Sequence, residues 1–494
     1  MIPLSALFLF YSYKYNACRS YYKAFYSVPH LPYRPDPADW LEPLRPLGYA
    51  LLLDSSDNTK SKPQPAPTSS ASRFDIITAA PELVTVVDGE TIVVYDHNNK
   101  TSSHSTHTIF ETLNQQLQTL EDQNFSHLPF AGGLAGFWGY ELNHLLEPGR
   151  IPPRKQNQPD MVVGLYLWAV ITDHHKKTTE LFFHPSMEEE KKQQILTLLS
   201  EYKGGRENEQ PAFSLDSAFQ PAITRERYHD SFNRIQEWIG SGDCYQVNLT
   251  QKFSASYSGD PWQAYKKLRT ITPTPFSAYL DFPQLKILSH SPERLLLSEN
   301  RQIETKPIKG TRPRGETPVQ DKAFANELLT STKDRAENLM IVDLLRNDLG
   351  RNCTPGSIRV PTLFGLESYA NVHHMVSTIT GELADNRSNI DLLRDAFPGG
   401  SVTGAPKIRA MEIIRELEPD ARSVYCGAIG YISCNGRMDT NIPIRTLVAD
   451  GKEISCWGGG AIVADSECES EYEESVTKVR NLIRGLEEFF SESE

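Results

Sequence analysis

The stretch at residues 228–250 combines a helix pattern with a strand pattern and reads Y-H-D-S-F-N-R-I-Q-E-W-I-G-S-G-D-C-Y-Q-V-N-L-T. Its first half has apolar residues at helical spacing, followed by glycines that end a helix: Tyr228, Phe232, Ile235, Ile239, then Gly240 and Gly242. Its second half alternates, as a strand does, with Tyr245, Val247 and Leu249 on one face and Gln246, Asn248 and Thr250 on the other. Together with the other strand-like runs of the chain, this mix of long, antiparallel-looking strands with helices predicts an α+β fold.

Two polar tracts divide the rest of the chain. Residues 54–72 are rich in Ser, Pro, Lys and Asn and predict a flexible loop. Residues 201–224 separate an N-terminal region, 1–220, from a C-terminal region, 221–494. The N-terminal region contains β-rich runs at Leu83–Tyr95 and Met161–Thr172. No pattern indicates a role for an N-terminal extension over residues 1–30.

Composition excludes several classes of protein. The 494 residues include 63 acidic and 50 basic side chains, so the net charge of −13 argues against a nucleic-acid or anionic-membrane surface. No apolar run is long enough to span a membrane, and the apolar start at Leu4–Tyr13 lacks the basic segment of a signal peptide. Seven scattered cysteines without zinc spacing indicate reduced thiols, so we expect a cytoplasmic protein.

The segment from Asp334 to Asp348 predicts a helix that is apolar around most of its circumference and therefore largely buried. Glu337 lies on the same stripe as Ile341 and Leu344. A buried carboxylate must be paired, protonated or bound to a metal, because an isolated buried charge is costly. The sequence leaves two equal alternatives for Glu337, a metal ligand or a salt bridge with Lys333 or Arg335.

A C-terminal helix is predicted over Glu469–Phe489, with a packing stripe at Tyr472, Val476, Val479, Ile483 and Leu486. Glu471 and Glu474 project from another face. A solvated acidic face is the commoner reading of such a pair. If that face instead lines a cleft with Glu337, the all-oxygen donor set suits Mg²⁺ rather than zinc.

Three glycine-rich segments predict tight turns that bring backbone N–H groups to an anion: Gly132–Gly139, Gly399–Gly404 and Gly458–Gly460. Turns without a ligand are the default reading. The second segment lacks the lysine of a phosphate loop, because Ala405 occupies that position, so a nucleotide site is disfavoured.

Three further side chains are candidates for chemistry. Lys309 is expected between a strand at Arg301–Thr305 and a turn, and Pro307, Ile308 and Gly310 around it favour partial desolvation. Desolvation would lower its pKa and make the amine a nucleophile or base, although most lysines are solvated surface charges. Glu293 and His374 carry no signal alone.

Taken together, these segments resemble the chorismate-utilising enzymes, which include anthranilate, isochorismate, salicylate and aminodeoxychorismate synthases. The resemblance covers residues 223–494 and rests on ordered motifs: G-D-C-Y-Q-V-N-L (242–249), S-P-E-R (291–294), P-I-K-G-T (307–311), the helix at 333–348, H-H-M-V-S-T (373–378), F-P-G-G-S-V-T-G-A-P-K (397–407), G-A-I-G-Y (427–431), I-R-T (444–446) and G-G-G-A-I-V-A-D-S (458–466). S-R-F-D (72–75) and G-G-L-A-G-F-W-G-Y (132–140) extend it more weakly to about residue 50.

The resemblance implies an α+β fold, a large antiparallel β-sandwich with helices packed outside, and a role for each matching residue. Mg²⁺ would bridge Glu337, Glu474 and a contributing Glu471 to a carboxylate of chorismate. Glu293 would act as general acid or base, and His374 would lie near the reacting ring. The substrate would be held by Arg445, Tyr431, Gly458, Gly459 and Gly460, with Thr311, Gln246 and Thr403 also at the site.

The residues at two positions distinguish among the reactions that members of this family catalyse. Family members that add water have lysine where this chain has Gln246, and glutamine cannot act as a base, which implies ammonia or an amine as nucleophile. Lysine in P-I-K-G-T marks the members that form 4-amino-4-deoxychorismate for para-aminobenzoate and folate synthesis, whereas anthranilate synthases have alanine there. Lys309 would attack C2 of chorismate covalently. The alternatives are an anthranilate-forming component and a non-catalytic subunit that binds chorismate or tryptophan.

The chain shows no glutaminase triad of its own. The resemblance therefore implies a heterodimer with a glutamine amidotransferase subunit that supplies ammonia. It also implies a tryptophan pocket, whose positions Ser55, Pro275 and Phe276 match loosely.

Overall fold

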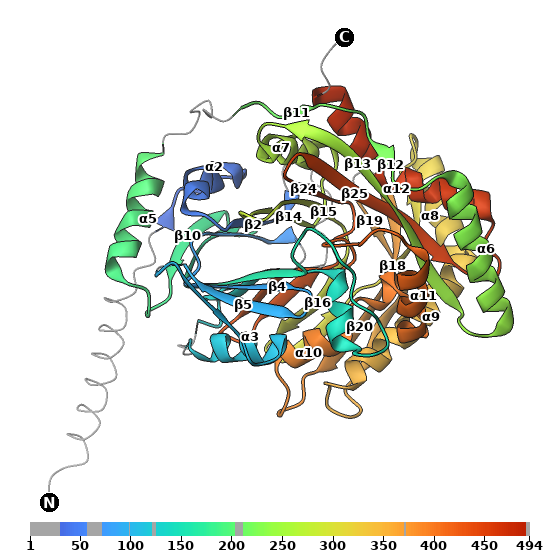
Figure 1. The fold of residues 1–494 in the computed structure, drawn as a ribbon, viewed down its shortest axis with the longest axis horizontal. Coiled ribbons are helices and arrows are strands. Elements are labelled where there is room, and N and C mark those ends of the chain that lie inside the picture. The colour runs from blue at the N-terminus through green and yellow to red at the C-terminus, as the bar shows by residue number, and fades with distance from the viewer. Residues whose placement is uncertain are drawn as a thin grey trace, which may run out of the picture.

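The computed structural model describes residues 30–56, 72–97, 99–120, 125–202, 211–369 and 372–490. Nearly all of the predicted N-terminal extension, and residues 57–71 of the predicted 54–72 loop, lie outside the described residues. Two large sheets form the centre of the molecule, and helices lie around them (Figure 1). Every strand pair recorded in the described ranges is antiparallel, which confirms the predicted α+β class.

Within the described residues the first sheet has 13 strands. In spatial order they are β1 (His30–Leu31), β10 (Thr178–Phe183), β9 (Trp168–Asp173), β3 (Phe74–Thr78), β2 (Ala50–Asp54), β14 (Phe276–Asp281), β15 (Lys286–Ser291), β24 (Thr446–Asp450), β25 (Glu453–Ile462), β13 (Gln246–Ser258) and β11 (Ser214–Leu215), while β12 (Gln220–Pro221) and β21 (Gly404–Ala405) also pair with β13.

The second sheet has 12 strands in the described part of the chain. Their order is β18 (Ile308–Pro313), β20 (Val372–Glu382), β17 (Gln302–Thr305), β16 (Arg294–Glu299), β23 (Met438–Asn441), β22 (Ala428–Ser433), β7 (Gly133–Trp138), β8 (Met161–Tyr166), β4 (Leu83–Asp88), β5 (Thr91–Asp96) and β6 (Thr101–His104), with β19 (Arg359–Ser368) on the other edge of β20.

The described helices are α2 (Ala38–Leu41), α3 (Ile109–Gln118), α4 (Asn143–Leu146), α5 (Glu189–Glu201), α6 (Arg225–Ser241), α7 (Pro261–Ile271), α8 (Pro318–Thr330), α9 (Thr332–Gly350), α10 (Asn389–Ala396), α11 (Lys407–Leu417) and α12 (Cys468–Phe490). The predicted helix–strand boundary is confirmed: α6 ends at Gly242, whose φ of 83° is readily adopted by glycine, and β13 follows. None of these described helices has both the length and the apolar composition that a membrane crossing requires.

Both predicted regions contribute strands to both sheets. β2 from the N-terminal half pairs with β14 from the C-terminal half, and β7 pairs with β22 in the same way. The boundary at residue 220 between an N-terminal and a C-terminal region therefore stays a prediction from the sequence. Each sheet contains strands from both sides of that boundary.

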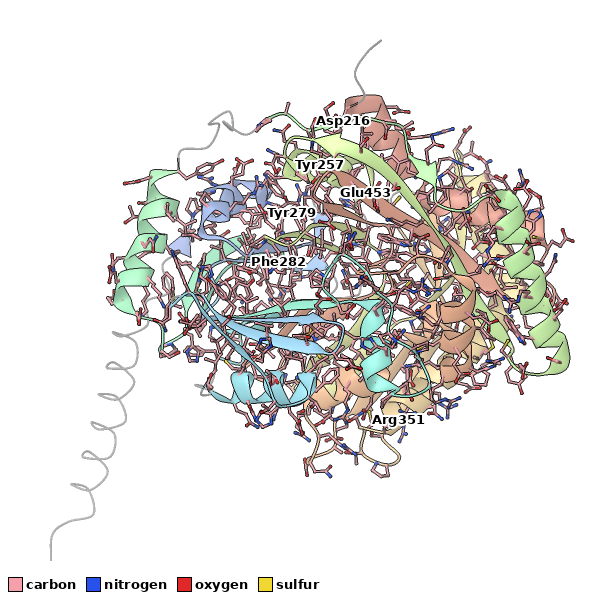
Figure 2. All side chains as sticks on the ribbon, viewed as in Figure 1. Asp216, Tyr257, Tyr279, Phe282, Arg351 and Glu453 are labelled. Carbon is pink, nitrogen blue, oxygen red and sulfur yellow. The ribbon has the colours of Figure 1, made fainter. Side chains whose placement is uncertain are left out.

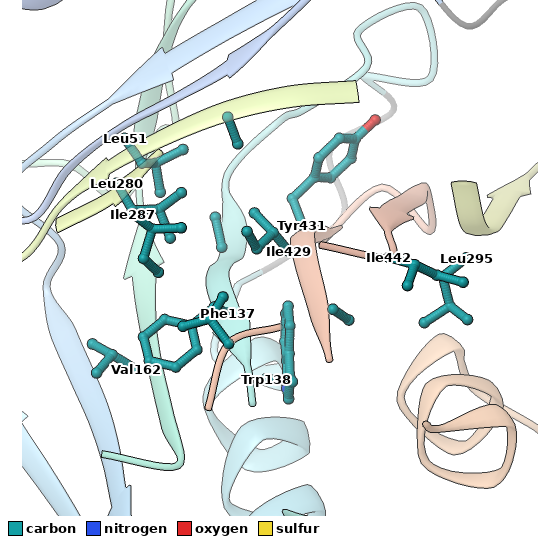
Figure 3. Packing of buried hydrophobic residues seen from close by; sticks show 14 of the residues in the cluster. Leu51, Phe137, Trp138, Val162, Leu280, Ile287, Leu295, Ile429, Tyr431 and Ile442 are labelled. Atoms are coloured by element: carbon teal, nitrogen blue, oxygen red, sulfur yellow. The ribbon is translucent and has the colours of Figure 1, made fainter. Parts of the chain in front are cut away.

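Figure 2 draws the side chains on the ribbon, and the buried apolar ones from both sheets form one cluster. Leu51, Leu280 and Ile287 of the first sheet lie opposite Phe137 and Val162 of the second (Figure 3). All five are at most 1% exposed, and burying each such side chain contributes roughly 1.5–3 kcal/mol. This core keeps in place the strand ends and helices that carry the candidate active site.

Candidate active site

A cavity of about 680 Å³ opens where β18, β20, α9 and α12 meet strands β13 and β25. That volume suits a small organic ligand. Many of the predicted site residues line it together: Lys309, Glu293, His374, Arg445, Thr311, Glu337, Glu471, Glu474 and Gly459. Residues far apart in the sequence thus converge on one space.

Lys309 lies in strand β18 rather than between a strand and a turn, which corrects the sequence-based placement. The strand bulges between Ile308 and Thr311, and Gly310 in this bulge has a φ of +78°. A side chain at Gly310 would also collide with Leu328 and Asp334, so the position requires glycine. Bulges of this kind re-aim the neighbouring side chain, here Lys309, at the cavity.

The amine of Lys309 donates a hydrogen bond to the backbone carbonyl of Ser401, with Nζ 3.1 Å from the oxygen. Burial lowers the pKa of this lysine, although the carboxylates of Glu337 and Glu293 partly oppose the shift. A lowered pKa increases the fraction of neutral amine near neutral pH. Lys309 is therefore suited to act as a nucleophile or base.

Glu293 is 4% exposed and follows the end of β15. Within the described residues its Oε1 has no hydrogen-bond partner. Burial raises the pKa of the carboxyl, against the opposing effect of Lys309 nearby. A carboxyl group that keeps its proton at higher pH can act as a general acid.

His374 in β20 lies opposite Thr311 in β18, and Thr311 Oγ1 is 2.9 Å from His374 Nδ1. Burial, with the nearby Arg445, lowers the pKa of His374 to about 3. The imidazole is therefore neutral, and Thr311 fixes its orientation. Arg445 itself lines the same cavity, with a left-handed backbone φ of 51°.

The three predicted metal ligands reach the cavity from two helices, Glu337 from α9 and Glu471 and Glu474 from α12. Burial raises the pKa of Glu337, whereas the ion pair with Lys478, at 2.6 Å, outweighs burial and lowers that of Glu474. Lys333 Nζ lies 3.5 Å from Glu471. Glu471 and Glu474 thus each pair with a lysine, and no group of three or more His, Cys, Asp or Glu side chains in the described ranges is arranged to hold a metal.

Helix α9 is less buried than predicted. Leu339 is 46% exposed, and the buried residues form one stripe that includes Ile341, Leu345 and Leu349. The helix is a surface helix whose N-terminal half faces the cavity. Glu337 is therefore half-buried at the cavity wall rather than enclosed in the core.

Two of the three predicted glycine turns are strands: Gly133–Trp138 is β7, and Gly458–Gly460 lies inside β25. The glycines are needed for close packing. A Cβ at Gly458 would lie 2.1 Å from the Ser475 carbonyl oxygen of α12, and one at Gly460 would lie 3.0 Å from Glu471 Oε2. Glycine therefore lets α12 pack against β25 and leaves room beside the acidic groups.

Some predicted site residues are not brought to this cavity. Thr403 is fully buried and donates to the Gly399 carbonyl, and Gln246 is fully buried with no partner for its amide among the described residues. Tyr431 instead lines a second cavity of about 60 Å³ with Ser55, Pro275 and Phe276. The three residues matched to a tryptophan site thus lie together in this second cavity.

Some residues that also line the cavity were not predicted from the sequence. Tyr425 lines it while its ring stacks on Trp457, with centroids 6.0 Å apart. Lys478 lies one helical turn beyond Glu474, a spacing that could have revealed it. Ser401 contributes through its backbone carbonyl, for which residue type gives no signal.

Comparison with known proteins gives consistent results. The chorismate binding enzyme family matches residues 62–484. Aminodeoxychorismate synthase component 1 from Salmonella typhimurium is 44% identical over 92% of this chain and 97% of its own length, and the protein of that name from Escherichia coli is 46% identical over 84% and 90%. The crystal structure of anthranilate synthase component I from Streptococcus pneumoniae superposes with a TM-score of 0.75 at 31% identity, covering 86% of this chain and 95% of that one.

Proposed function

Since this chain belongs to the chorismate binding enzyme family, we propose that it acts as component 1 of an aminodeoxychorismate synthase. It is an enzyme that converts chorismate and ammonia to 4-amino-4-deoxychorismate. One observation carries the assignment of the amination to C4: a lysine of lowered pKa, Lys309, points into the cavity that holds the other family residues.

In the first half of the reaction, the neutral amine of Lys309 forms a C–N bond at C2 of chorismate. The ring double bonds shift towards C4, and the C4–O bond breaks. The departing hydroxyl takes a proton from Glu293 and leaves as water. The enzyme then carries a secondary ammonium adduct and a Glu293 carboxylate.

In the second half, ammonia adds at C4, the double bonds shift back, and the C2–N bond breaks to release Lys309 as a neutral amine. Glu293 regains its proton from the new ammonium group at C4. The sum is chorismate plus ammonia giving 4-amino-4-deoxychorismate plus water. Two displacements by good nucleophiles thus replace one difficult displacement.

Charged and polar side chains in the wall of the cavity would bind and orient chorismate. The guanidinium of Arg445 is suited to a carboxylate of chorismate. Neutral His374, oriented by Thr311, can donate one hydrogen bond to an oxygen substituent of the ring.

Mg²⁺ dependence is part of the proposal. Glu337, Glu471 and Glu474 would hold the ion, since they offer only oxygen donors and Gly460 leaves space beside them, and the ion would replace the lysines that pair with Glu471 and Glu474. When bound, the ion would neutralise a substrate carboxylate as a Lewis acid. We expect Glu337→Gln to lower turnover by at least about 100-fold and to remove its response to Mg²⁺, which a titration of initial rate against Mg²⁺ measures. An unchanged half-saturating Mg²⁺ concentration would exclude Glu337 as a ligand, and Asp343→Asn, on the exposed part of α9, is the matched control.

The ammonia would come from a partner. The name of the relatives, component 1, implies a second component, and we propose a glutamine amidotransferase subunit in a cytoplasmic heterodimer. Within the described residues the cysteines form no disulfide and most are buried, which supports a reducing location.

The second cavity is the candidate tryptophan pocket. Its lining combines apolar Phe276 and Pro275 with Ser55 and the charged Arg437 and Asp439, a set that suits a zwitterion with an apolar side chain. We expect L-tryptophan to give a saturable calorimetric signal that Ser55→Trp abolishes. Absence of heat at millimolar L-tryptophan would rule the pocket out as a tryptophan site.

The function itself is tested by incubating the purified chain with chorismate, Mg²⁺ and concentrated ammonium salt. Mass spectrometry of the separated products should show 4-amino-4-deoxychorismate without any partner protein. Anthranilate as the product would refute the proposal and place the chain in the tryptophan branch.

A further inference from the structure

The carbonyl oxygen of Ser401 accepts two hydrogen bonds inside the reaction cavity. One comes from Lys309 Nζ at 3.1 Å, and the other from the side-chain amide of Asn248, with Nδ2 at 3.2 Å. Asn248 also lines the cavity, is 8% exposed, and lies in β13. The lysine and the asparagine are therefore coupled through one backbone atom.

We propose that Asn248 is a positioning residue for Lys309, acting through the Ser401 carbonyl. A carbonyl oxygen has two lone pairs, and here each has one donor. Asn248 fixes where the oxygen lies, and the oxygen in turn fixes the amine. The inference rests on the proposed function, in which that amine is the nucleophile.

The arrangement matters during attack on C2. The hydrogen bond to Ser401 uses an N–H of the amine and leaves its lone pair free, so the place of the carbonyl oxygen sets the direction of that lone pair. Asn248 is the second donor to this oxygen and therefore holds the short turn at Gly400–Val402 that carries it. Without the asparagine amide the turn would be held less firmly, and the amine would no longer be aimed at C2.

The backbone around Asn248 is fixed from both sides. Its N–H donates to the Thr403 carbonyl at 2.8 Å, and its own carbonyl accepts from Arg422 Nη2 at 2.8 Å. The other Arg422 nitrogen, Nη1, donates to the Val402 carbonyl at 2.9 Å. Arg422 is fully buried and paired with Glu418 at 2.7 Å. β13 and the turn that carries Ser401 thus form one rigid unit, and Asn248 is its contact with the lysine.

The test compares Asn248→Ala and Asn248→Leu with the wild type in steady-state kinetics and in single turnover with chorismate. Leucine restores the volume of asparagine but has no donor, so it separates hydrogen bonding from packing. We expect kcat to fall roughly 10- to 100-fold in both variants, as for a small misplacement of a reacting group, with KM for chorismate changed less than about twofold. The rate at which the Lys309 adduct forms, followed by intact mass after rapid quenching, should fall by the same factor.

Asn389→Ala is the matched control. Asn389 is similarly buried, and its amide donates to the Gly436 carbonyl at 2.8 Å, away from the cavity. It should lose the same kind of hydrogen bond, with a similar change in Tm, and keep the kcat of the wild type.

Three results would overturn the inference: a kcat within twofold of the wild type in Asn248→Ala, recovery of activity in Asn248→Leu, or a loss confined to KM, which would mean that Asn248 contacts the substrate. A wild-type enzyme that turns over without any lysine adduct would instead refute the covalent step of the proposed function, and the inference with it. The intact mass of the quenched wild-type enzyme, with or without a lysine adduct, therefore distinguishes a failure of the proposed function from a failure of the inference about Asn248.

Discussion

Lys309→Ala should lower kcat for formation of 4-amino-4-deoxychorismate by at least about 100-fold, the lower range for loss of a group that takes part in the chemical step. Without the amine, no adduct can form at C2, and ammonia must displace the C4 hydroxyl unaided. The space vacated beside C2 becomes open to ammonia, so we expect the residual product to carry nitrogen at C2. Product analysis by mass spectrometry and NMR measures both effects.

Lys306→Ala is the control for this change. Lys306 is three residues away in the same segment but pairs with Glu367 outside the cavity lining, so kcat should stay within about twofold of the wild type. Full activity of Lys309→Ala with the same product would refute the covalent role of Lys309.

Glu293→Gln should lower kcat by about 10²- to 10⁴-fold with little change in KM, because glutamine keeps the shape of the side chain but cannot give a proton to the departing hydroxyl. Oxygen-18 exchange or chorismate consumption in single turnover would locate the defect in the first half-reaction. Glu299→Gln is the control, since Glu299 lies at the end of β16 and pairs with Arg437. A wild-type rate of adduct formation in Glu293→Gln would show that another group supplies the proton.

The pH dependence follows from the same two groups. The reaction needs Lys309 neutral, which is favoured above its pKa, and Glu293 protonated, which is favoured below its pKa. Burial lowers the pKa of the lysine and raises that of the carboxyl, so the two shifts narrow the gap between them. A larger fraction of molecules then carries both groups in the active form. In the Glu293→Gln variant, the decline of kcat on the alkaline side that is due to Glu293 should disappear.

Much of the fold was predictable from local sequence. The end of α6 at Gly242 and the start of β13 follow from hydrophobic period, and α12 lies within one residue of the predicted helix at each end. These elements have one apolar face against a core, so their periodicity reports their structure directly.

The errors have physical causes that local sequence does not contain. Gly458 was predicted to be part of a turn, yet it lies in strand β25. Glycine is needed there because the backbone of α12 leaves no space for a side chain. Lys309 lies in a bulged strand, and only pairing with β20 reveals the bulge. Tyr425 and Tyr431 are both buried aromatic residues of one segment, but their side chains reach different cavities, which depends on how the chain runs into β22.

The candidate site was largely predictable as a set of residue types and motifs. What could not be predicted is the backbone chemistry that organises it. The Ser401 carbonyl, shared by Lys309 and Asn248, is an atom that every residue possesses, so only the folded geometry distinguishes it.

The position of nitrogen in the product is the most direct test of amination at C4 of chorismate. The purified chain is incubated with chorismate, Mg²⁺ and ¹⁵N-labelled ammonium, and the product is examined by ¹³C–¹⁵N correlated NMR. We expect ¹⁵N bonded to C4, with the enolpyruvyl side chain intact. Nitrogen bonded to C2, with release of pyruvate, would contradict this expectation.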